Sequence, residues 1–137
     1  MGHEGEMREA MRWVAQAKDD LSAAQVLTDN SKFAQACFLC QQAGEKAAKA
    51  VWFFLGEDPW GHSIARLIDD LKDEVIRKQM QKLTSEAMLL DRLYIPTRYP
   101  NGLPEITPMK AYERRDAMAA SEAAVALVRV AEQIIER

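Results

Sequence analysis

The chain has 137 residues, 48% of them hydrophobic and 28% charged, and its formal net charge is −3. This length and composition predict one globular domain with its own core, and the acidic balance argues against strong non-specific binding to nucleic acid, which requires clustered Lys and Arg. No run of 18 apolar residues and no signal-peptide core occurs, so we expect a cytoplasmic protein that does not enter a membrane.

The first predicted helix covers about residues 6–28. Apolar side chains recur there at steps of three and four residues, which is the period of an amphipathic helix. Asp29, Asn30 and Ser31 follow, and side chains of these types favour turns and helix starts. We therefore expect this helix to bury one face and to end in a tight turn.

The second predicted helix covers about residues 32–55 and ends at Gly56. Its apolar stripe includes Cys37 and Cys40, which form a CxxC motif. A reactive CxxC pair usually lies at a helix N-terminus, where the thiol pKa is lowered. Because these cysteines lie in the middle of the helix, we expect free thiols packed in the core rather than a disulfide or a redox centre.

The end of this helix, residues 51–55, is apolar on every side, with the sequence Val-Trp-Phe-Phe-Leu. A helix that is apolar all round is buried on more than one side. A second subunit would cover it, and we favour a homodimer for this reason. The alternative cover is the segment 57–80 of the same chain.

Three further helices are expected. Ser63 precedes the pattern of residues 64–75, a fourth helix runs from Thr84 until Pro96 ends it, and an alanine-rich helix covers about residues 110–136. No window alternates strongly enough to predict a strand. The predicted fold class is all-α, an up-and-down antiparallel bundle of four to five helices in a single domain.

Conventional catalytic and metal-binding patterns are absent from the sequence. His3 and His62 are the only histidines, and no Glu-x-x-His pair, zinc-type His and Cys cluster or Gly-rich phosphate loop occurs. We therefore assign no catalytic residue and no metal ligand.

Charged residues at helical spacing offer the first candidate site. Glu45 and Lys49 are four residues apart, which is typical of a surface ion pair, and with Lys46 they could instead form a strip that binds an anion. His62 is either a hydrogen-bonding residue of a turn or a further member of this strip. Both interpretations stay open at this point.

The second candidate is the segment 95–108, which holds four of the five prolines. Proline restricts the backbone, so such a loop loses little entropy when it becomes ordered. Arg98 and Tyr99 would then present a guanidinium and an aromatic ring, groups that suit a phosphate or a stacked base. The alternative is that Arg98 closes the bundle by donating to helix carbonyls.

Four segments together resemble the HEPN family, the higher eukaryotes and prokaryotes nucleotide-binding domain, over about residues 7–134. They are "AKDDLSAAQVL" (17–27), "FAQACFLCQQAGEKAAKAVWFFLG" (33–56), "HSIARLIDDL" (62–71) and "LDRLYIPTRYP" (90–100).

The resemblance implies a small bacterial or archaeal bundle, commonly dimeric and often encoded beside a minimal nucleotidyltransferase, including in toxin–antitoxin pairs. It predicts a nucleotide-binding or partner-binding module within the single domain 1–137, with no cofactor beyond a bound nucleotide. In this interpretation lysines and the arginine hold phosphate, the tyrosine stacks, and the glutamate orients a lysine or a ribose hydroxyl. The site residues are Glu45, Lys46, Lys49, His62, Arg98 and Tyr99.

Many members of the family are ribonucleases that carry an Arg followed four to six residues later by a His, both facing the dimer cleft. Here Arg98 begins "RYP", and no histidine occurs beyond His62. We therefore expect a binding module rather than this kind of enzyme. A ribonuclease using His62, and a purely structural interaction protein, are the alternatives.

Overall fold

The computed structural model describes residues 2–97, 99 and 105–136. These residues form helices joined by turns and contain no strand, which confirms the all-α class. The helices are α1 (Gly2–Asp29), α2 (Phe33–Phe54), α3 (Ile64–Asp69), α4 (Glu74–Gln81), α5 (Thr84–Asp91), α6 (Pro108–Ala111) and α7 (Arg114–Ile135).

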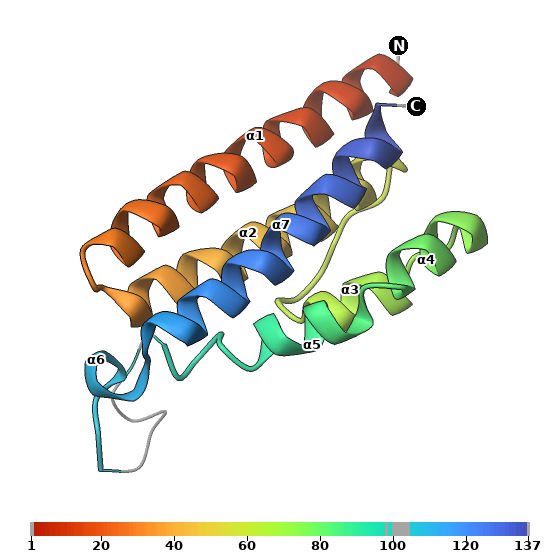
Figure 1. The fold of residues 1–137 in the computed structure, drawn as a ribbon. Coiled ribbons are helices and arrows are strands. Elements are labelled where there is room, and N and C mark those ends of the chain that lie inside the picture. Colours follow the sequence, from red (N-terminus) through yellow and green to blue (C-terminus); the bar gives the residue numbers. More distant parts are fainter. Residues whose placement is uncertain (1, 98, 100–104, 137) are drawn as a thin grey trace.

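The three long helices α1, α2 and α7 pack side by side, with α2 and α7 running in the same direction and α1 running opposite to both (Figure 1). At one end the Arg114 guanidinium lies 5.1 Å from the centre of the Phe33 ring, so the starts of α7 and α2 are neighbours. At the other end Ala50 and Ile135 share a buried cluster. The antiparallel packing predicted for consecutive long helices holds for α1 and α2, and α2 and α7 are not consecutive because α3, α4 and α5 lie between them in the chain.

The short helices α3, α4 and α5 lie beside the layer formed by α2 and α7 (Figure 1). The connection 55–63 turns back along α2, so that Ile64 at the start of α3 lies against the middle of α2. The position that allows this approach is Gly44, where a Cβ atom would lie 2.6 Å from Leu90 Cδ1 and 3.0 Å from Ile64 Cδ1. A larger residue would force α3 and α5 away from α2.

The predicted helix over residues 64–75 is two helices in the structure, α3 and α4. The Asp73 carboxylate accepts a hydrogen bond from the backbone N–H of Ile76 at 3.0 Å, which makes Asp73 the N-cap of α4. Aspartate competes for backbone donors in this way and therefore favours a new helix start over the interior of a helix. The sequence prediction was wrong at this point.

The last predicted helix also begins later than expected, at Arg114 instead of residue 110. Glu113 and Asp116 form a capping box, in which the side chain of each accepts a hydrogen bond from the backbone N–H of the other. Tyr112 is extended and separates α7 from the single turn of α6. The fourth predicted helix, α5, ends at Asp91, and a series of turns carries the chain to Thr97.

Side chains of the same chain cover much of the apolar end of α2. Trp52 donates its indole N–H to the carbonyl oxygen of Leu67 in α3 at 2.9 Å, and Phe53 stacks on Trp13 of α1 with ring centres 5.1 Å apart. The contact with α3 is the alternative cover that the sequence left open, and α1 supplies the rest. The homodimer therefore stays a prediction that needs other support.

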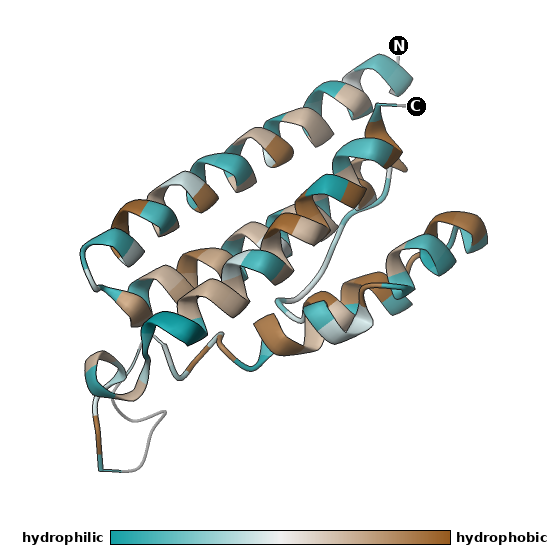
Figure 2. Cartoon of the chain, in the orientation of Figure 1, coloured by the Kyte–Doolittle hydropathy of each residue, from teal (hydrophilic) through white to brown (hydrophobic). Residues whose placement is uncertain are grey.

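Hydrophilic and hydrophobic positions alternate along α1, as an amphipathic helix requires (Figure 2).

Cys37 and Cys40 of α2 are buried free thiols, which confirms that they pack in the core. Burial raises the pKa of each thiol to about 12. None of the helices in the described part of the chain combines the length and apolar character needed to cross a membrane.

Candidate functional site

The centre of the candidate site is the Glu45 carboxylate on α2, whose side chain is only 8% exposed. One carboxylate oxygen, Oε1, accepts a hydrogen bond from Gln41 at 3.1 Å. The other, Oε2, lies 2.8 Å from Lys49 Nζ and 3.1 Å from His62 Nδ1. We call Glu45, Lys49 and His62 the charged cluster.

These contacts set the protonation of Glu45. Burial by itself raises the pKa of a carboxyl group, because it disfavours the charged form. The hydrogen bonds from Lys49, Gln41 and His62 outweigh this effect and leave the pKa of Glu45 below its ordinary value. The carboxylate is therefore charged at neutral pH and holds its partners by charge-assisted hydrogen bonds.

His62 precedes α3, and contacts from α5 and the turn after it help to place it. The Asp91 carboxylate, at the end of α5, accepts from the backbone N–H groups of Ile64 at 2.6 Å and Ala65 at 3.1 Å, and so holds the start of α3. Tyr94, three residues beyond Asp91, stacks on the imidazole with ring centres 4.9 Å apart and planes inclined by 16°. The His62 side chain is nevertheless 58% exposed. Glu45 and Tyr94 contact the imidazole, and the rest of the ring is open to solvent.

The two lysines of the predicted strip are both engaged with carboxylates. Lys49 pairs with Glu45, whereas Lys46 points to α1 and pairs with Asp20. Both lysine side chains are largely covered. The charged residues therefore do not form one strip, and neither ammonium faces solvent without a carboxylate beside it.

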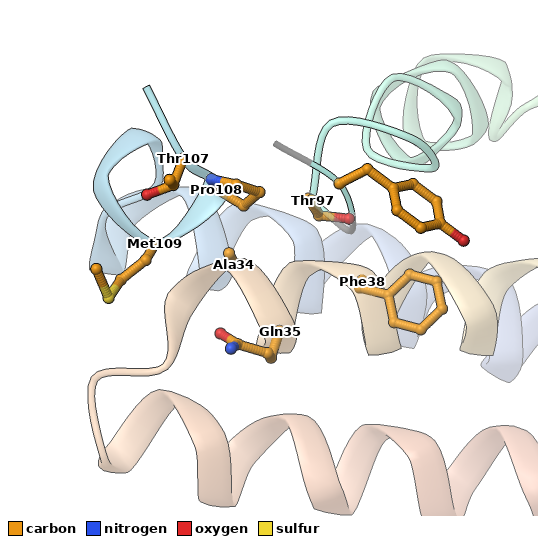
Figure 3. Close-up of a pocket in the computed structure, with 8 residues that line it drawn as sticks. Ala34, Gln35, Phe38, Thr97, Thr107, Pro108 and Met109 are labelled. Atoms are coloured by element: carbon orange, nitrogen blue, oxygen red, sulfur yellow. The ribbon is translucent and has the colours of Figure 1, made fainter. Parts of the chain in front are cut away.

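Tyr99 lines a hollow of about 510 Å³, together with Thr97 and residues of α2 and α6. We call this hollow the aromatic groove. Figure 3 shows Gln35 and Phe38 on α2, with Phe38 on the side of Thr97 and with Thr107 and Met109 near Ala34. None of the described lining residues is charged. Arg98, the neighbour of Tyr99 in sequence, lies outside the described residues.

The aromatic groove and the charged cluster lie on the same side of α2. Phe38, Glu45 and Lys49 are seven and four residues apart, so they follow one another along one helical face. Of the six residues predicted from the sequence, Glu45, Lys49 and His62 come together and Tyr99 lies further along this face, while Lys46 points elsewhere.

The sequence model of the HEPN domain family matches residues 10–137 of the chain. The chain belongs to the HEPN domain family. The resemblance inferred from the sequence is thereby confirmed over almost the whole length, and the charged cluster and the aromatic groove are features of a HEPN domain.

Solved structures agree with this assignment. TT1696 from Thermus thermophilus is 35% identical, with a TM-score of 0.83, over 90% of this chain and 96% of that one. ST0689, described as an archaeal HEPN homologue, is 31% identical with a TM-score of 0.75, over 92% and 97% of the two chains. A HEPN domain protein of Thermotoga maritima is 28% identical with a TM-score of 0.67, over 92% and 98%. No curated protein sequence matches the chain.

The sequence analysis did not predict three residues of this HEPN domain that position the charged cluster. Gln41 is four residues before Glu45, a spacing that could have suggested the hydrogen bond. Tyr94 and Asp91 act on the loop before α3 from a distant part of the chain, and no local pattern indicates such contacts. Within the described residues no group of three or more His, Cys, Asp or Glu side chains is placed to hold a metal ion.

Proposed function

We propose that this HEPN domain is a module that binds a nucleotide, or a partner bearing a nucleotide, on the exposed side of α2, and that it acts with a minimal nucleotidyltransferase in a toxin–antitoxin type pair. The observation that carries the proposal is the position of Glu45. A carboxylate is costly to bury unless it is hydrogen-bonded, and this one holds the covered ammonium of Lys49 and the exposed imidazole of His62 on the side of α2 that also carries the uncharged aromatic groove.

The chemistry of this side suits the two halves of a nucleotide. The aromatic groove offers Phe38 and Tyr99 to a base, and stacking of a base on an aromatic ring contributes roughly 1–3 kcal/mol. His62 offers an exposed imidazole at the other end of the same side. Phe38 and Glu45 are two turns apart on α2, roughly 10 Å, so one extended ligand reaches both.

We infer roles for the predicted residues that are consistent with these contacts. Tyr99 stacks on the base, His62 contacts the ligand, and Glu45 with Lys49 positions His62 instead of binding phosphate directly. Lys46 has no part on this side, because it pairs with Asp20. Arg98 remains the phosphate-binding candidate inferred from the sequence alone.

Calorimetric titration with a panel of nucleotides tests this proposal. We expect at least one nucleotide to bind, and Tyr99→Ala to weaken binding about tenfold, because a stacking contact is lost. Val75→Ala on α4, which also truncates an exposed apolar side chain, is the matched control and should bind as the wild type does. If Tyr99→Ala and the wild type bind nucleotides with equal affinity, the aromatic groove is not part of the binding site.

We further propose that the partner is a nucleotidyltransferase encoded nearby and that the HEPN domain forms a homodimer. The family resemblance supports both statements. Co-expression of the two chains tests the first: the nucleotidyltransferase should co-purify with the wild type. If it elutes separately at micromolar concentration, the pairing is wrong.

One observation favours a different function, a ribonuclease with a non-standard site. The hydrogen bond between Glu45 and His62 Nδ1 is the kind of contact that orients an imidazole as a general base. Cleavage of RNA that is lost in His62→Ala would support this alternative. A chain that binds neither nucleotides nor RNA would instead be a structural interaction protein.

A further inference from the structure

A second hollow, of about 450 Å³, lies where the connection 55–63 meets α3, the yellow-green part of Figure 1. Trp60, His62 and Arg66 line it, together with Asp70. The hollow is separate from the aromatic groove, and the two share no described lining residue.

Trp60 is the most unusual residue of this hollow. It is 87% exposed, more than any other large hydrophobic residue that the structure describes. Trp13 and Trp52 are partly buried, and each donates its indole N–H, to Glu9 at 3.1 Å and to Leu67 at 2.9 Å. Among the described residues, Trp60 makes no hydrogen bond and no ring contact.

Proline and glycine flank Trp60. Pro59 precedes it and has its φ angle fixed by the ring. Gly61 follows with a φ of +86°, a conformation that favours glycine. The indole therefore lies in a turn and is exposed to solvent, and a large amphipathic ring displayed in this way is typical of a binding contact.

A cation lines the same hollow as this ring. Arg66 on α3 has an 82% exposed side chain, and its Nε lies 3.5 Å from Asp70 Oδ2. An exposed pair at this distance contributes little to stability, so the guanidinium can exchange Asp70 for a phosphate, which it binds with two parallel hydrogen bonds. His62, at the side of the hollow, is fixed by Glu45 and Tyr94.

We propose that Trp60, His62 and Arg66 form a subsite for a nucleoside phosphate. The base stacks on Trp60, the phosphate binds Arg66, and the imidazole of His62 hydrogen-bonds the ligand between them. Every base has an aromatic face, so the subsite distinguishes nucleotides from other phosphates rather than one base from another. The inference rests on the proposed nucleotide binding and adds a second position for a base, at Trp60, that is separate from the aromatic groove.

Titration calorimetry with AMP, adenosine, ribose 5-phosphate and inorganic phosphate tests the subsite. We expect AMP to bind the wild type most tightly. Trp60→Ala should weaken AMP and adenosine at least tenfold, and Arg66→Ala should weaken AMP tenfold but leave adenosine unchanged. Arg66→Lys should recover only part of the AMP affinity, because an ammonium lacks the planar fork.

Control variants separate this inference from the proposed function. Val75→Ala, an exposed apolar truncation on α4 outside both hollows, should leave every affinity unchanged. If AMP binds but only Tyr99→Ala weakens it, the module binds nucleotides in the aromatic groove and the subsite is wrong. If Trp60→Ala leaves AMP binding intact but dissociates a dimer, Trp60 is an interface residue and the subsite is equally wrong. Absence of AMP binding to the wild type at millimolar concentration would overturn the subsite, whereas the nucleotide-binding proposal fails only if no nucleotide of the panel binds.

Discussion

The Nδ1 atom of His62 lies 3.1 Å from Oε2 of Glu45, so a mostly exposed imidazole is tied to a carboxylate that the protein covers almost completely. The same oxygen lies 2.8 Å from Lys49 Nζ. The buried carboxylate thus holds two cationic or potentially cationic groups, and the stability of this corner of the HEPN domain should depend on it.

Removing the carboxylate should destabilise the fold measurably. We expect Glu45→Ala to lower the free energy of unfolding by about 2 kcal/mol, because Lys49 and the buried amide of Gln41 both lose a partner. Glu74→Ala breaks another pair of residues four apart, Glu74 with Lys78, in which both side chains are exposed, and should cost under about 0.5 kcal/mol. Urea denaturation of the two variants measures the contrast, and equal losses would contradict it.

The same carboxylate predicts a loss of stability in acid. Burial by itself raises the pKa of Glu45. The hydrogen bonds from Lys49, Gln41 and His62 have a larger, opposite effect, so the pKa lies below its ordinary value of 4.5. A group whose pKa is lower in the folded state stabilises the fold above its unfolded-state pKa, and this contribution is lost as the pH falls through the folded-state pKa.

The difference in unfolding free energy between the wild type and Glu45→Gln measures this loss. It should be fully present above about pH 4.5 and shrink as the pH falls below that value. A difference that stays constant down to pH 3 would show that the contacts of Glu45 do not depend on its charge.

The two thiols should be inert in the folded protein. Burial raises the pKa of Cys37 and Cys40 to about 12, so the reactive thiolate is scarcer than at an ordinary cysteine by about a thousandfold. Ellman's reagent should therefore modify both cysteines in denaturant and neither in buffer. Rapid labelling of the native protein would mean that this part of α2 opens readily.

We expect the purified protein not to cleave single-stranded or structured RNA at a useful rate. No histidine follows Arg98, and the family resemblance leads us to expect an Arg and His pair in the members that are ribonucleases. Gel analysis of labelled RNA incubated with wild type and His62→Ala provides the measurement. Cleavage by the wild type alone would assign catalysis to the Glu45 and His62 pair.

Light scattering at micromolar concentration should give about twice the 15.5 kDa chain mass. The apolar end of α2 no longer motivates this prediction, because Trp13 and α3 contact it within the chain. The exposed apolar residues Ile95, Ile106 and Met109 offer another surface, and Met109→Glu should shift the dimer toward monomer. A monomeric wild type would refute the homodimer.

Local patterns in the sequence predicted the long helices closely, because a long amphipathic period and a following turn mark a helix well. The first two helices differ from the prediction by a few residues at most, and the cysteines pack as expected. The apolar pattern did not show that residues 64–75 belong to two helices, α3 and α4, instead of one. An aspartate such as Asp73 is compatible with an exposed helix position and with an N-cap, and only the path of the chain decides between them.

The candidate site was predictable only where helical spacing determines it. Positions four apart share a face, which is why Glu45 and Lys49 meet, but spacing does not say which neighbouring helix covers the next position. Lys46 therefore turned out to pair with Asp20 of α1. The stacking of Tyr94 on His62 joins segments that are distant in sequence and has no local signal.

The turn after α5 gives the two candidate binding regions a common wall. Tyr94 supports His62 at one end, and Tyr99 borders the aromatic groove at the other. If a ligand displaced this wall from one region, it would change the affinity of the other region. Thermodynamic linkage then requires that a ligand in either region change the affinity of the other region by the same factor. The affinity measured at one region would therefore depend on whether the other region is occupied.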